Sequence, residues 1–318
     1  MSVVNKLRKK PFVSIVIPMY NEEESAAQTL SQVVKSLEEY KGKYEVIFVD
    51  DCSKDKSIEA ITKTRKDADV KILALRKNVG HMRALCIGIA QAKGDCVITL
   101  DCDLQDPPRY IPKLIEIFLS ETLRNQNIDV IQTVRVDRSS DTFFKSSTAK
   151  LYYRIIRTLT GVSVTPNAAD YRLMSRSCVD TLIGLSEKEK IFRLLIPELG
   201  FKVHNLEIIR EPRYAGKSKY PVSKMISLAI NSAIGFTTKP LRVLGICGVV
   251  ASFLMLALSL IFGILWLQGR TVPGWTSIVF LILSTNAALF AAVGLLGEYV
   301  SRIYIQVQNR PEVIYDKI

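Results

Sequence analysis

The chain has 318 residues, of which 48% are hydrophobic and 23% are charged. Its mean hydropathy of +0.18 is high for a purely soluble protein, so the composition predicts a soluble part joined to a membrane part. The net charge of +12 fits either nucleic-acid binding or a domain that faces anionic lipid headgroups. Long uncharged stretches after residue 240 favour the second interpretation, so no nucleic-acid partner is expected.

The first 135 residues alternate short apolar runs with amphipathic stretches. The apolar runs are rich in β-branched residues, which is typical of buried parallel strands, and the stretches between them have helical spacing. Asn21 is expected to cap the first helix, whose first turn is acidic. The alternation indicates an α/β fold with a mostly parallel sheet and helices on both faces. Strands are predicted at 12–18, 44–51, 70–76, 95–103 and 129–135, and helices at 21–40, 57–67, 81–93 and 107–120.

Two uncharged stretches occupy much of the C-terminal third. Residues 243–267 and 275–297 each exceed the roughly 20 residues that a helix needs to cross a hydrocarbon core of about 30 Å. The link between them is short, so a helical hairpin is predicted. Lysines and arginines flank the pair, whereas the link holds only Arg270, which predicts that both termini and the soluble domain are cytoplasmic.

The expected domain plan follows from these stretches. A cytosolic domain spans 1–220, with an interfacial helix at about 143–161 for which a core-facing helix is the alternative. A juxtamembrane amphipathic helix follows at 221–240 and two membrane-spanning helices at 241–303. Residues 304–318 form a cytosolic tail. No N-terminal secretory signal is expected.

Carboxylates follow three of the predicted strands. Asp50 and Asp51 end one strand, and Glu22 follows another. Asp101 and Asp103 would point the same way on a regular strand. Ligands bind beyond the carboxyl ends of such strands, and Mg²⁺ prefers one or two carboxylates with phosphate oxygens and water. The pattern predicts a divalent cation, Mg²⁺ or Mn²⁺, shared with a diphosphate, although Asp-x-Asp alone is more often a solvated turn.

Several ordered motifs resemble a known family. The segments VSIVIPMYNEE, EVIFVDDCSKDKS, LRKNVGHMRAL, GDCVITLDCDLQDPP and NAADYRLMSR together resemble family-2 glycosyltransferases with the GT-A fold. They are similar to the polyprenyl-phosphate branch, which includes relatives of dolichyl-phosphate mannose synthase and bacterial bactoprenol glucosyltransferases. The predicted C-terminal hairpin looks like the bacterial subgroup, which implies a multi-pass protein of the bacterial inner membrane. Small residues in AALFAAVGLLG favour a homo-oligomer.

The resemblance assigns the strand ends to nucleotide-sugar binding. Pro18, Tyr20 and Glu22 would line the nucleoside pocket. Asp101 and Asp103 match the family's metal-binding pair. The full predicted donor set is Pro18, Tyr20, Glu22, Asp50, Asp51, Asn78, Gly80, Asp101, Cys102, Asp103 and Gln105, with Ser53 supporting the loop and Cys102 expected to be structural.

The same resemblance places an acceptor site after residue 150. Asp170, Tyr171 and Arg172 match the family's D-[FY]-R motif, while residues 167–169 depart from the usual pattern. The catalytic candidates are Asp103, Asp170 and Arg172. Predicted contacts to the lipid phosphate are Arg154, Arg157, Arg172, Lys217, Ser218 and Lys219. The last three lie in RYAGKSKYPVSKM, whose alternative interpretation is a flexible basic linker.

The implied reaction is inverting transfer of a hexose from a nucleoside diphosphate to a polyprenyl phosphate such as undecaprenyl phosphate, for modification of lipopolysaccharide or another cell-surface glycan. Glucose from UDP-glucose is the first choice, with GDP-mannose, UDP-N-acetylhexosamine and UDP-modified arabinose as alternatives. A phosphate monoester carries about −1.5 to −2 charge at pH 7, so the acceptor needs no strong base. A processive polysaccharide synthase, a non-catalytic nucleotide-sugar-binding membrane protein and a small membrane channel are the remaining alternatives.

Overall fold

The computed structural model of the chain describes residues 10–64, 69–123, 128–136, 165–185, 187, 190–211 and 315–318, with isolated positions between 250 and 307. The chain divides into two compact units. The first unit comprises Met1–Tyr153, Val162–Tyr220 and Arg310–Ile318. The second comprises Arg154–Gly161 and Pro221–Asn309.

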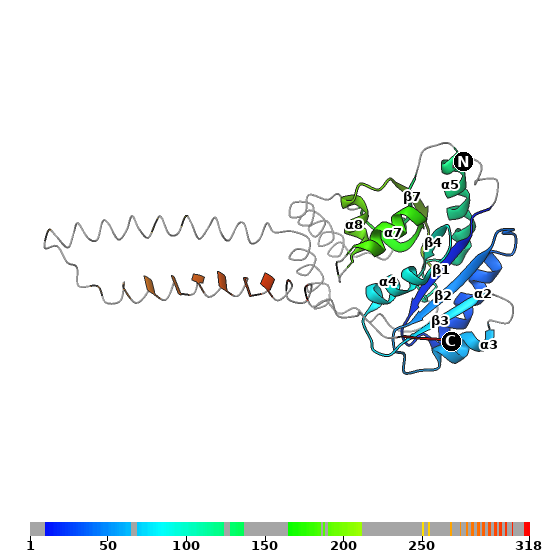
Figure 1. Cartoon of the computed structure of the whole chain (residues 1–318), viewed down its shortest axis with the longest axis horizontal. Helices are drawn as coiled ribbons and strands as arrows, with labels where there is room; N and C mark the ends of the chain where they lie inside the picture. Colours follow the sequence, from blue (N-terminus) through cyan, green and yellow to red (C-terminus); the bar gives the residue numbers. More distant parts are fainter. Residues whose placement is uncertain are drawn as a thin grey trace. The chain divides into compact units, whose positions relative to one another are not determined.

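The described part of the first unit contains an eight-stranded sheet in the order β7-β5-β6-β4-β1-β2-β3-β8 (Figure 1). The β1–β2, β1–β4, β2–β3 and β5–β7 pairs are parallel, whereas β3–β8, β4–β6 and β5–β6 are antiparallel. The predicted parallel arrangement is confirmed for β4-β1-β2-β3, and the antiparallel β6 and β8 make the whole sheet mixed. The strands are β1 (Val13–Met19), β2 (Tyr44–Asp50), β3 (Val70–Leu75), β4 (Cys96–Thr99), β5 (Val130–Arg135), β6 (Ala168–Ser175), β7 (Val203–Ile208) and β8 (Tyr315–Lys317).

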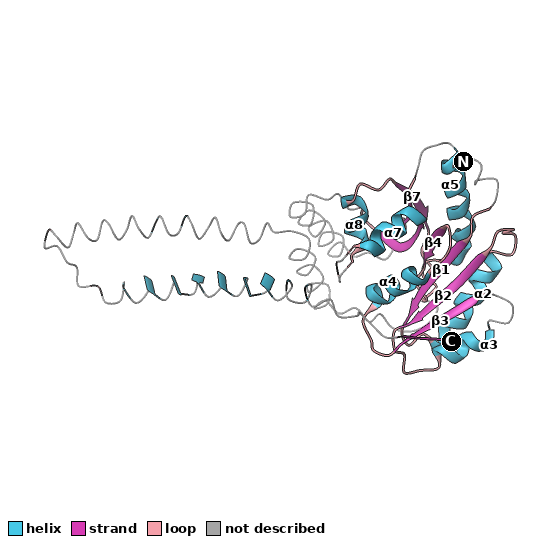
Figure 2. Ribbon diagram, viewed as in Figure 1, coloured by secondary structure: helices cyan, strands magenta, loops and turns pink. Residues whose placement is uncertain are grey.

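Helices cover both faces of this sheet (Figure 2). On one face, α2 and α5 pack on a core that includes Ile15, Ile17 and Phe48. On the other face, α4 lies against β1 and β2 and contacts α7. The helical elements are α2 (Glu23–Ser36), α3 (Ser57–Thr64), α4 (His81–Gln91), η1 (Pro108–Tyr110), α5 (Ile111–Leu123), α7 (Arg176–Gly184) and α8 (Phe192–Glu198).

Close approach of α4 to the sheet depends on Gly88. A Cβ at this position would lie 2.4 Å from Val16 Cγ1 and 2.7 Å from Val49 Cγ2. Both valines are completely buried. Because real Cβ atoms do not come this close, only glycine fits between the helix and these two strands.

Two local predictions are wrong. Asn21 does not cap α2, because it adopts a left-handed backbone with φ 52° and its side chain accepts a hydrogen bond from Lys54 N at 2.8 Å. The strand predicted at 95–103 ends at Thr99. Asp101 and Asp103 therefore lie in the turn after β4 and not on the strand itself.

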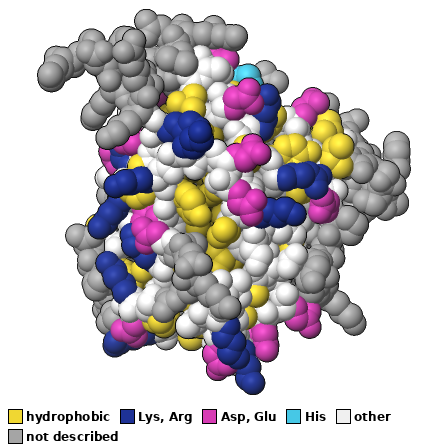
Figure 3. Space-filling view, turned by 90° about the vertical axis from the view of Figure 1, so that its right-hand side faces the viewer, with side chains coloured by type: hydrophobic (Ala, Val, Ile, Leu, Met, Phe, Trp, Pro, Cys, Tyr) yellow, Lys and Arg dark blue, Asp and Glu magenta, His cyan; other side chains and the backbone are white. Residues whose placement is uncertain are grey.

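Charge is distributed evenly over the face shown in Figure 3. Lysine and arginine side chains alternate there with aspartate and glutamate, and small apolar patches lie between them. The net positive charge of the chain is therefore not gathered into one basic patch on this face.

Several predictions fall mainly on residues outside the described ranges. These include the interfacial helix at 143–161, the juxtamembrane helix at 221–240 and most positions of the two predicted spans. Among the residues that the structure does describe, no helix is both long enough and apolar enough to cross a membrane.

Candidate active site

The carboxyl ends of β1, β2 and β4 meet at one edge of the sheet. Parallel pairing sets Met19 opposite Asp50 and Val16 opposite Thr99. The loops that follow these strands carry most of the residues predicted to bind the donor. In an open α/β sheet this edge is where ligands bind.

The segment after β1 is fastened to the segment after β2. Asn21 N donates to Ser53 Oγ at 2.9 Å, and Glu22 N donates to Ser57 Oγ at 2.9 Å. Pro18 is buried within β1, whereas Tyr20 is 36% exposed. The predicted nucleoside residues thus surround a braced turn, and Tyr20 has its ring at the surface.

Asp50 is a buried carboxylate with spare hydrogen-bonding capacity. Its Oδ2 accepts a hydrogen bond from Ser53 N at 3.1 Å. Its Oδ1 is buried and has no partner among the described residues. Burial raises the pKa of Asp50, although the bonds from Ser53 oppose this shift. Such an oxygen can accept a hydrogen bond from a ligand N–H or hydroxyl.

Asp51 holds the loop that follows β3. Its two carboxylate oxygens accept hydrogen bonds from Val79 N at 2.7 Å and Gly80 N at 2.9 Å. Asn78 Nδ2 also donates to the Asp51 carbonyl at 3.1 Å. Gly80 has φ +88°, a conformation in which other side chains are strained. The hydrogen bonds that Asn78, Val79 and Gly80 donate to Asp51 therefore fix the loop, and those from Val79 and Gly80 occupy both of its carboxylate oxygens.

Asp101 lies among several other charges in the turn after β4. Its Oδ1 is 3.4 Å from His81 Nε2. Burial raises the pKa of Asp101 to about 6, with His81 opposing and Asp170, Asp103 and Asp106 adding to the rise. Concentrated negative charge of this kind favours binding of a cation.

Contacts within the turn and with the protein core hold the other residues of this turn in place. Asp103 Oδ1 accepts a hydrogen bond from Gln105 N at 3.1 Å. Cys102 is buried, and its Sγ lies 4.0 Å from Thr29 Oγ1 on α2. Gln105 Oε1 accepts a hydrogen bond from Arg210 Nη2. Cys102 thus has the structural surroundings expected of it.

The donor set can be tested for its fit to a metal. Within the described part of the chain, no three His, Cys, Asp or Glu side chains come together to form a metal site by themselves. Asp101 and Asp103 offer two carboxylates, and Mg²⁺ or Mn²⁺ commonly completes such a pair with phosphate oxygens and water. The residues therefore fit a divalent cation that binds together with a diphosphate.

On β6, the buried Arg172 forms an ion pair with Asp170, whose side chain is 26% exposed. Arg172 Nη2 donates to Asp170 Oδ1 at 2.6 Å and to the Ala169 carbonyl at 3.1 Å. Burial opposes ionisation of Asp170, but Arg172 and Arg193 outweigh it and lower the pKa of this carboxyl. Arg193 Nη2 lies 3.9 Å from the same oxygen. Arg172 is 0% exposed, and its Nε and Nη1 have no hydrogen-bond partner among the described residues.

Some residues near the site were not singled out from the sequence. Asp106 is buried and pairs with Arg135, which ends β5. His81 and Arg193 were not singled out either. His81 stands within the quoted motif LRKNVGHMRAL, but the other contacts join residues far apart in the chain, so spacing alone gave no signal. The predicted lipid-phosphate residues Arg154, Arg157, Lys217, Ser218 and Lys219 lie outside the described ranges.

An open α/β sheet whose parallel half ends in paired carboxylates is the architecture of the GT-A enzymes. Among solved structures, the chain is similar to glucosyl-3-phosphoglycerate synthase from Mycobacterium tuberculosis in complex with Mn²⁺, UDP and phosphoglyceric acid. The TM-score is 0.53 and the identity 16%, over 72% of this chain and 78% of that one. The likeness shows the shared GT-A fold.

Sequence comparison identifies the family. The family model described as Glycosyl transferase family 2 matches residues 14–183. The chain belongs to this family and is a glycosyltransferase. It is 34% identical over 312 residues to the Bacillus subtilis protein described as uncharacterized glycosyltransferase YkcC, covering 96% of this chain and 93% of that protein.

A second relative carries a specific activity in its name. The chain is 34% identical over 327 residues to undecaprenyl-phosphate 4-deoxy-4-formamido-L-arabinose transferase of Proteus mirabilis. The match covers 100% of this chain and 96% of that protein. The similarity therefore extends over the second unit as well as the GT-A domain.

Proposed function

We propose that this glycosyltransferase moves a sugar from a nucleoside diphosphate to a polyprenyl phosphate at a membrane surface. The observation that carries the proposal is the meeting of Asp50, Asp101 and Asp103 at one edge of the sheet. Asp50 has a buried oxygen without a hydrogen-bond partner among the described residues. Asp101 and Asp103 form the carboxylate pair.

The donor would lie along this edge. Asp50 Oδ1 would accept a hydrogen bond from the base or ribose, with Tyr20 beside the nucleoside. Gly80, which carries no side chain, leaves space next to the nucleotide: a Cβ there would meet nothing within 4 Å. Asp101 and Asp103 would hold a divalent cation, which when bound supplies positive charge to the diphosphate leaving group.

The acceptor would approach from the side of β6 and α8. A polyprenyl phosphate is dianionic near neutral pH, so the protein must bring two anions together and needs cations to do so. Arg193 is 33% exposed next to Asp170, and Arg172 neutralises Asp170 from within the core. We assign Arg193 to the acceptor phosphate and Asp170 to its orientation. The chemistry then depends on positioning and electrostatic stabilisation of the leaving diphosphate.

The names of five relatives help to select the sugar. Each is named undecaprenyl-phosphate 4-deoxy-4-formamido-L-arabinose transferase. The expectation of glucose receives no support from these names. A UDP-linked modified arabinose is therefore the preferred donor in the proposal, and UDP-glucose is the second candidate.

Membrane attachment is part of the same proposal. The described positions of the second unit expose large apolar side chains, up to 76% for Val307. Exposed apolar side chains over a long segment mark contact with a membrane or a partner. The exposed residues are Val250, Leu254, Ile278, Leu281, Ile282, Leu289, Val293, Leu296, Val300, Ile303 and Val307.

A donor panel tests the proposed reaction. Membranes containing the full chain would be incubated with undecaprenyl phosphate, Mn²⁺ and one radiolabelled nucleotide sugar at a time. Transfer of label to the lipid fraction from one donor, and its loss with Asp103→Asn membranes, would support the proposal. Absence of labelled lipid with every donor, in membranes that hold the folded chain, would refute it.

A further inference from the structure

The β8 strand joins the sheet from a distant part of the sequence. It pairs with β3 in antiparallel register, with Ala74 opposite Asp316 and Leu75 opposite Tyr315. Just beyond it, Ile318 exchanges two backbone hydrogen bonds with Ile72, at 3.0 and 3.3 Å. The chain thus returns to the first unit and covers the β3 edge of the sheet.

One side-chain pair fastens β8 at the point where β3 ends. Arg76 Nε donates to Asp316 Oδ2 at 3.1 Å, and Arg76 Nη2 donates to Asp316 Oδ1 at 2.8 Å. The two residues are 240 positions apart in the sequence. Their side chains are 62% and 57% exposed, so the pair adds little to global stability. Its two hydrogen bonds nevertheless give a defined geometry that links the residue after β3 to β8.

The segment that begins at Arg76 leads directly into the nucleotide edge. Val79 N and Gly80 N bind the Asp51 carboxylate a few residues later. His81 then opens α4, with its Nε2 3.4 Å from Asp101. Residues 77–81 therefore contact two of the carboxylates at the proposed donor site, and β8 holds the start of this segment.

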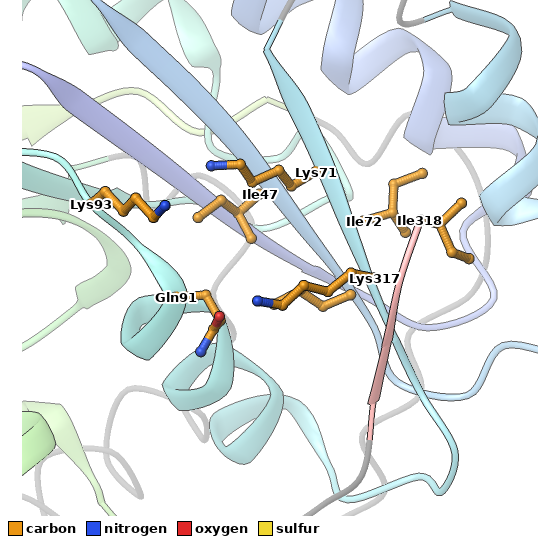
Figure 4. A pocket seen from close by; sticks show the side chains of 8 residues that line it. Ile47, Lys71, Ile72, Gln91, Lys93, Lys317 and Ile318 are labelled. Carbon is orange, nitrogen blue, oxygen red and sulfur yellow. The ribbon is translucent and has the colours of Figure 1, made fainter.

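A pocket lies beside β8. Lys317 and Ile318 line a pocket of about 190 Å³ together with Ile47, Ile72 and Gln91 (Figure 4). The pocket is open to solvent, so Lys317 and Ile318 border accessible space on this side of the strand. The backbone ladder to β3 and the Arg76–Asp316 pair attach the strand to the sheet.

We infer that β8 is a positioning element for the nucleotide site, and that Asp316 acts through Arg76 to order residues 77–81. The inference rests on the proposed function in one respect, namely that the edge near Asp51 and Asp101 binds a nucleoside diphosphate. Without β8, β3 becomes an edge strand and the following loop loses its anchor. Nucleotide binding must then order that loop, and the cost weakens the affinity.

Matched variants of the full chain test this inference, with UDP and Mn²⁺ as the binding probe. Asp316→Ala and Arg76→Ala are each expected to weaken UDP binding about threefold, as for loss of an exposed but well-oriented pair. Deletion of residues 315–318 should weaken it about tenfold, an ordinary coupling between adjacent elements. Lys317→Ala, in the same strand but outside the pair, should leave UDP affinity unchanged.

Two further measurements separate positioning from a general loss of structure. Hydrogen exchange of residues 77–81 should accelerate in the deletion variant, while exchange in α2 and α5 stays as in the wild type. The swapped pair, Arg76→Asp with Asp316→Arg, should restore both UDP affinity and protection relative to either single charge reversal. If Arg76 and Asp316 acted independently of each other, the swapped pair would not restore UDP affinity or protection.

The outcomes that overturn the inference are specific. Unchanged UDP affinity in the deletion variant would overturn it, and so would faster exchange throughout the sheet. A wild-type chain that binds UDP but transfers no sugar to lipid would refute the proposed reaction and leave this test intact, because UDP binding and exchange do not require turnover.

Discussion

Arg135 donates two hydrogen bonds to Asp106, from Nε to Oδ1 at 3.0 Å and from Nη2 to Oδ2 at 2.6 Å. The Asp106 side chain is 1% exposed and that of Arg135 27%. Burial disfavours the charged guanidinium, yet the bonds to Asp106 raise the pKa of Arg135 overall. The pair joins the turn after β4, which carries Asp101 and Asp103, to the end of β5.

The first prediction concerns this pair. Asp106→Asn should lower the free energy of unfolding by about 2 kcal/mol, because one charge-assisted bond is lost and Arg135 remains partly buried. Urea unfolding of the purified chain measures the change. Asp180→Asn removes the partner of Arg176 in an exposed pair and should cost less than about 0.5 kcal/mol. Equal losses in the free energy of unfolding for the two variants would contradict a larger contribution from the Asp106–Arg135 pair.

The second prediction concerns the carboxylate pair. Asp103→Asn should reduce sugar transfer at least about 100-fold, the usual effect of removing one group that stabilises developing charge. Circular dichroism and the unfolding midpoint should remain near the wild-type values. Asp69→Asn, at an exposed position before β3, should retain full activity. Wild-type turnover in the Asp103 variant would show that this carboxylate has no part in the reaction.

The third prediction separates acceptor from donor. Arg193→Ala should raise the apparent KM for undecaprenyl phosphate about tenfold, since a bond between charged groups is lost. UDP affinity should not change. Lys202→Ala, at an exposed cation, serves as the control. A change in UDP affinity with no change in acceptor dependence would assign Arg193 to the donor.

The fourth prediction concerns packing between α4 and the sheet. Gly88→Ala should destabilise the fold by about 2 kcal/mol, because the new Cβ would press against Val16 and Val49. At Gly184, near the end of α7, a Cβ would meet nothing within 4 Å. Gly184→Ala should therefore be neutral or stabilising by about 0.5 kcal/mol. Thermal unfolding of the two variants compares them directly, and a stable Gly88 variant would mean that α4 can shift outwards.

The fifth prediction concerns pH. Glu45 is 0% exposed and accepts hydrogen bonds from Ser14 Oγ, Lys93 N and Lys71 Nζ. Burial alone would raise the pKa of Glu45, but these bonds lower it below its ordinary value of 4.5. Its stabilising contribution is therefore present above pH 4.5 and is lost as the pH falls through the lowered pKa.

Comparison with Glu45→Gln measures this contribution. At pH 7 the variant should be about 2 kcal/mol less stable, a value kept modest because Lys71 is 41% exposed and screened by water. The difference should shrink as the pH falls below 4.5. A difference that stays constant down to pH 3 would show that ionisation of Glu45 is not involved.

Local patterns predicted the central half of the fold correctly. The runs that became β1 and β2 are buried on both faces, and a continuous apolar pattern is what such strands require. The prediction failed where a side chain had a distant partner. Asn21 has the chemistry of a helix cap, but its oxygen binds Lys54 N, which no local pattern reveals.

The sequence by itself indicated the family, the alternation of strands and helices that makes part of the sheet parallel, and the grouping of carboxylates near the carboxyl ends of the strands, because these depend on residue type and short spacing. The tertiary structure alone decided which charges meet. It buried Arg172 against Asp170, joined Arg135 to Asp106, and brought Asp316 to Arg76 across 240 positions. The physical reason is that ion pairs and edge-strand pairing act over a few ångströms in space, and the folded chain sets those distances independently of separation along the sequence.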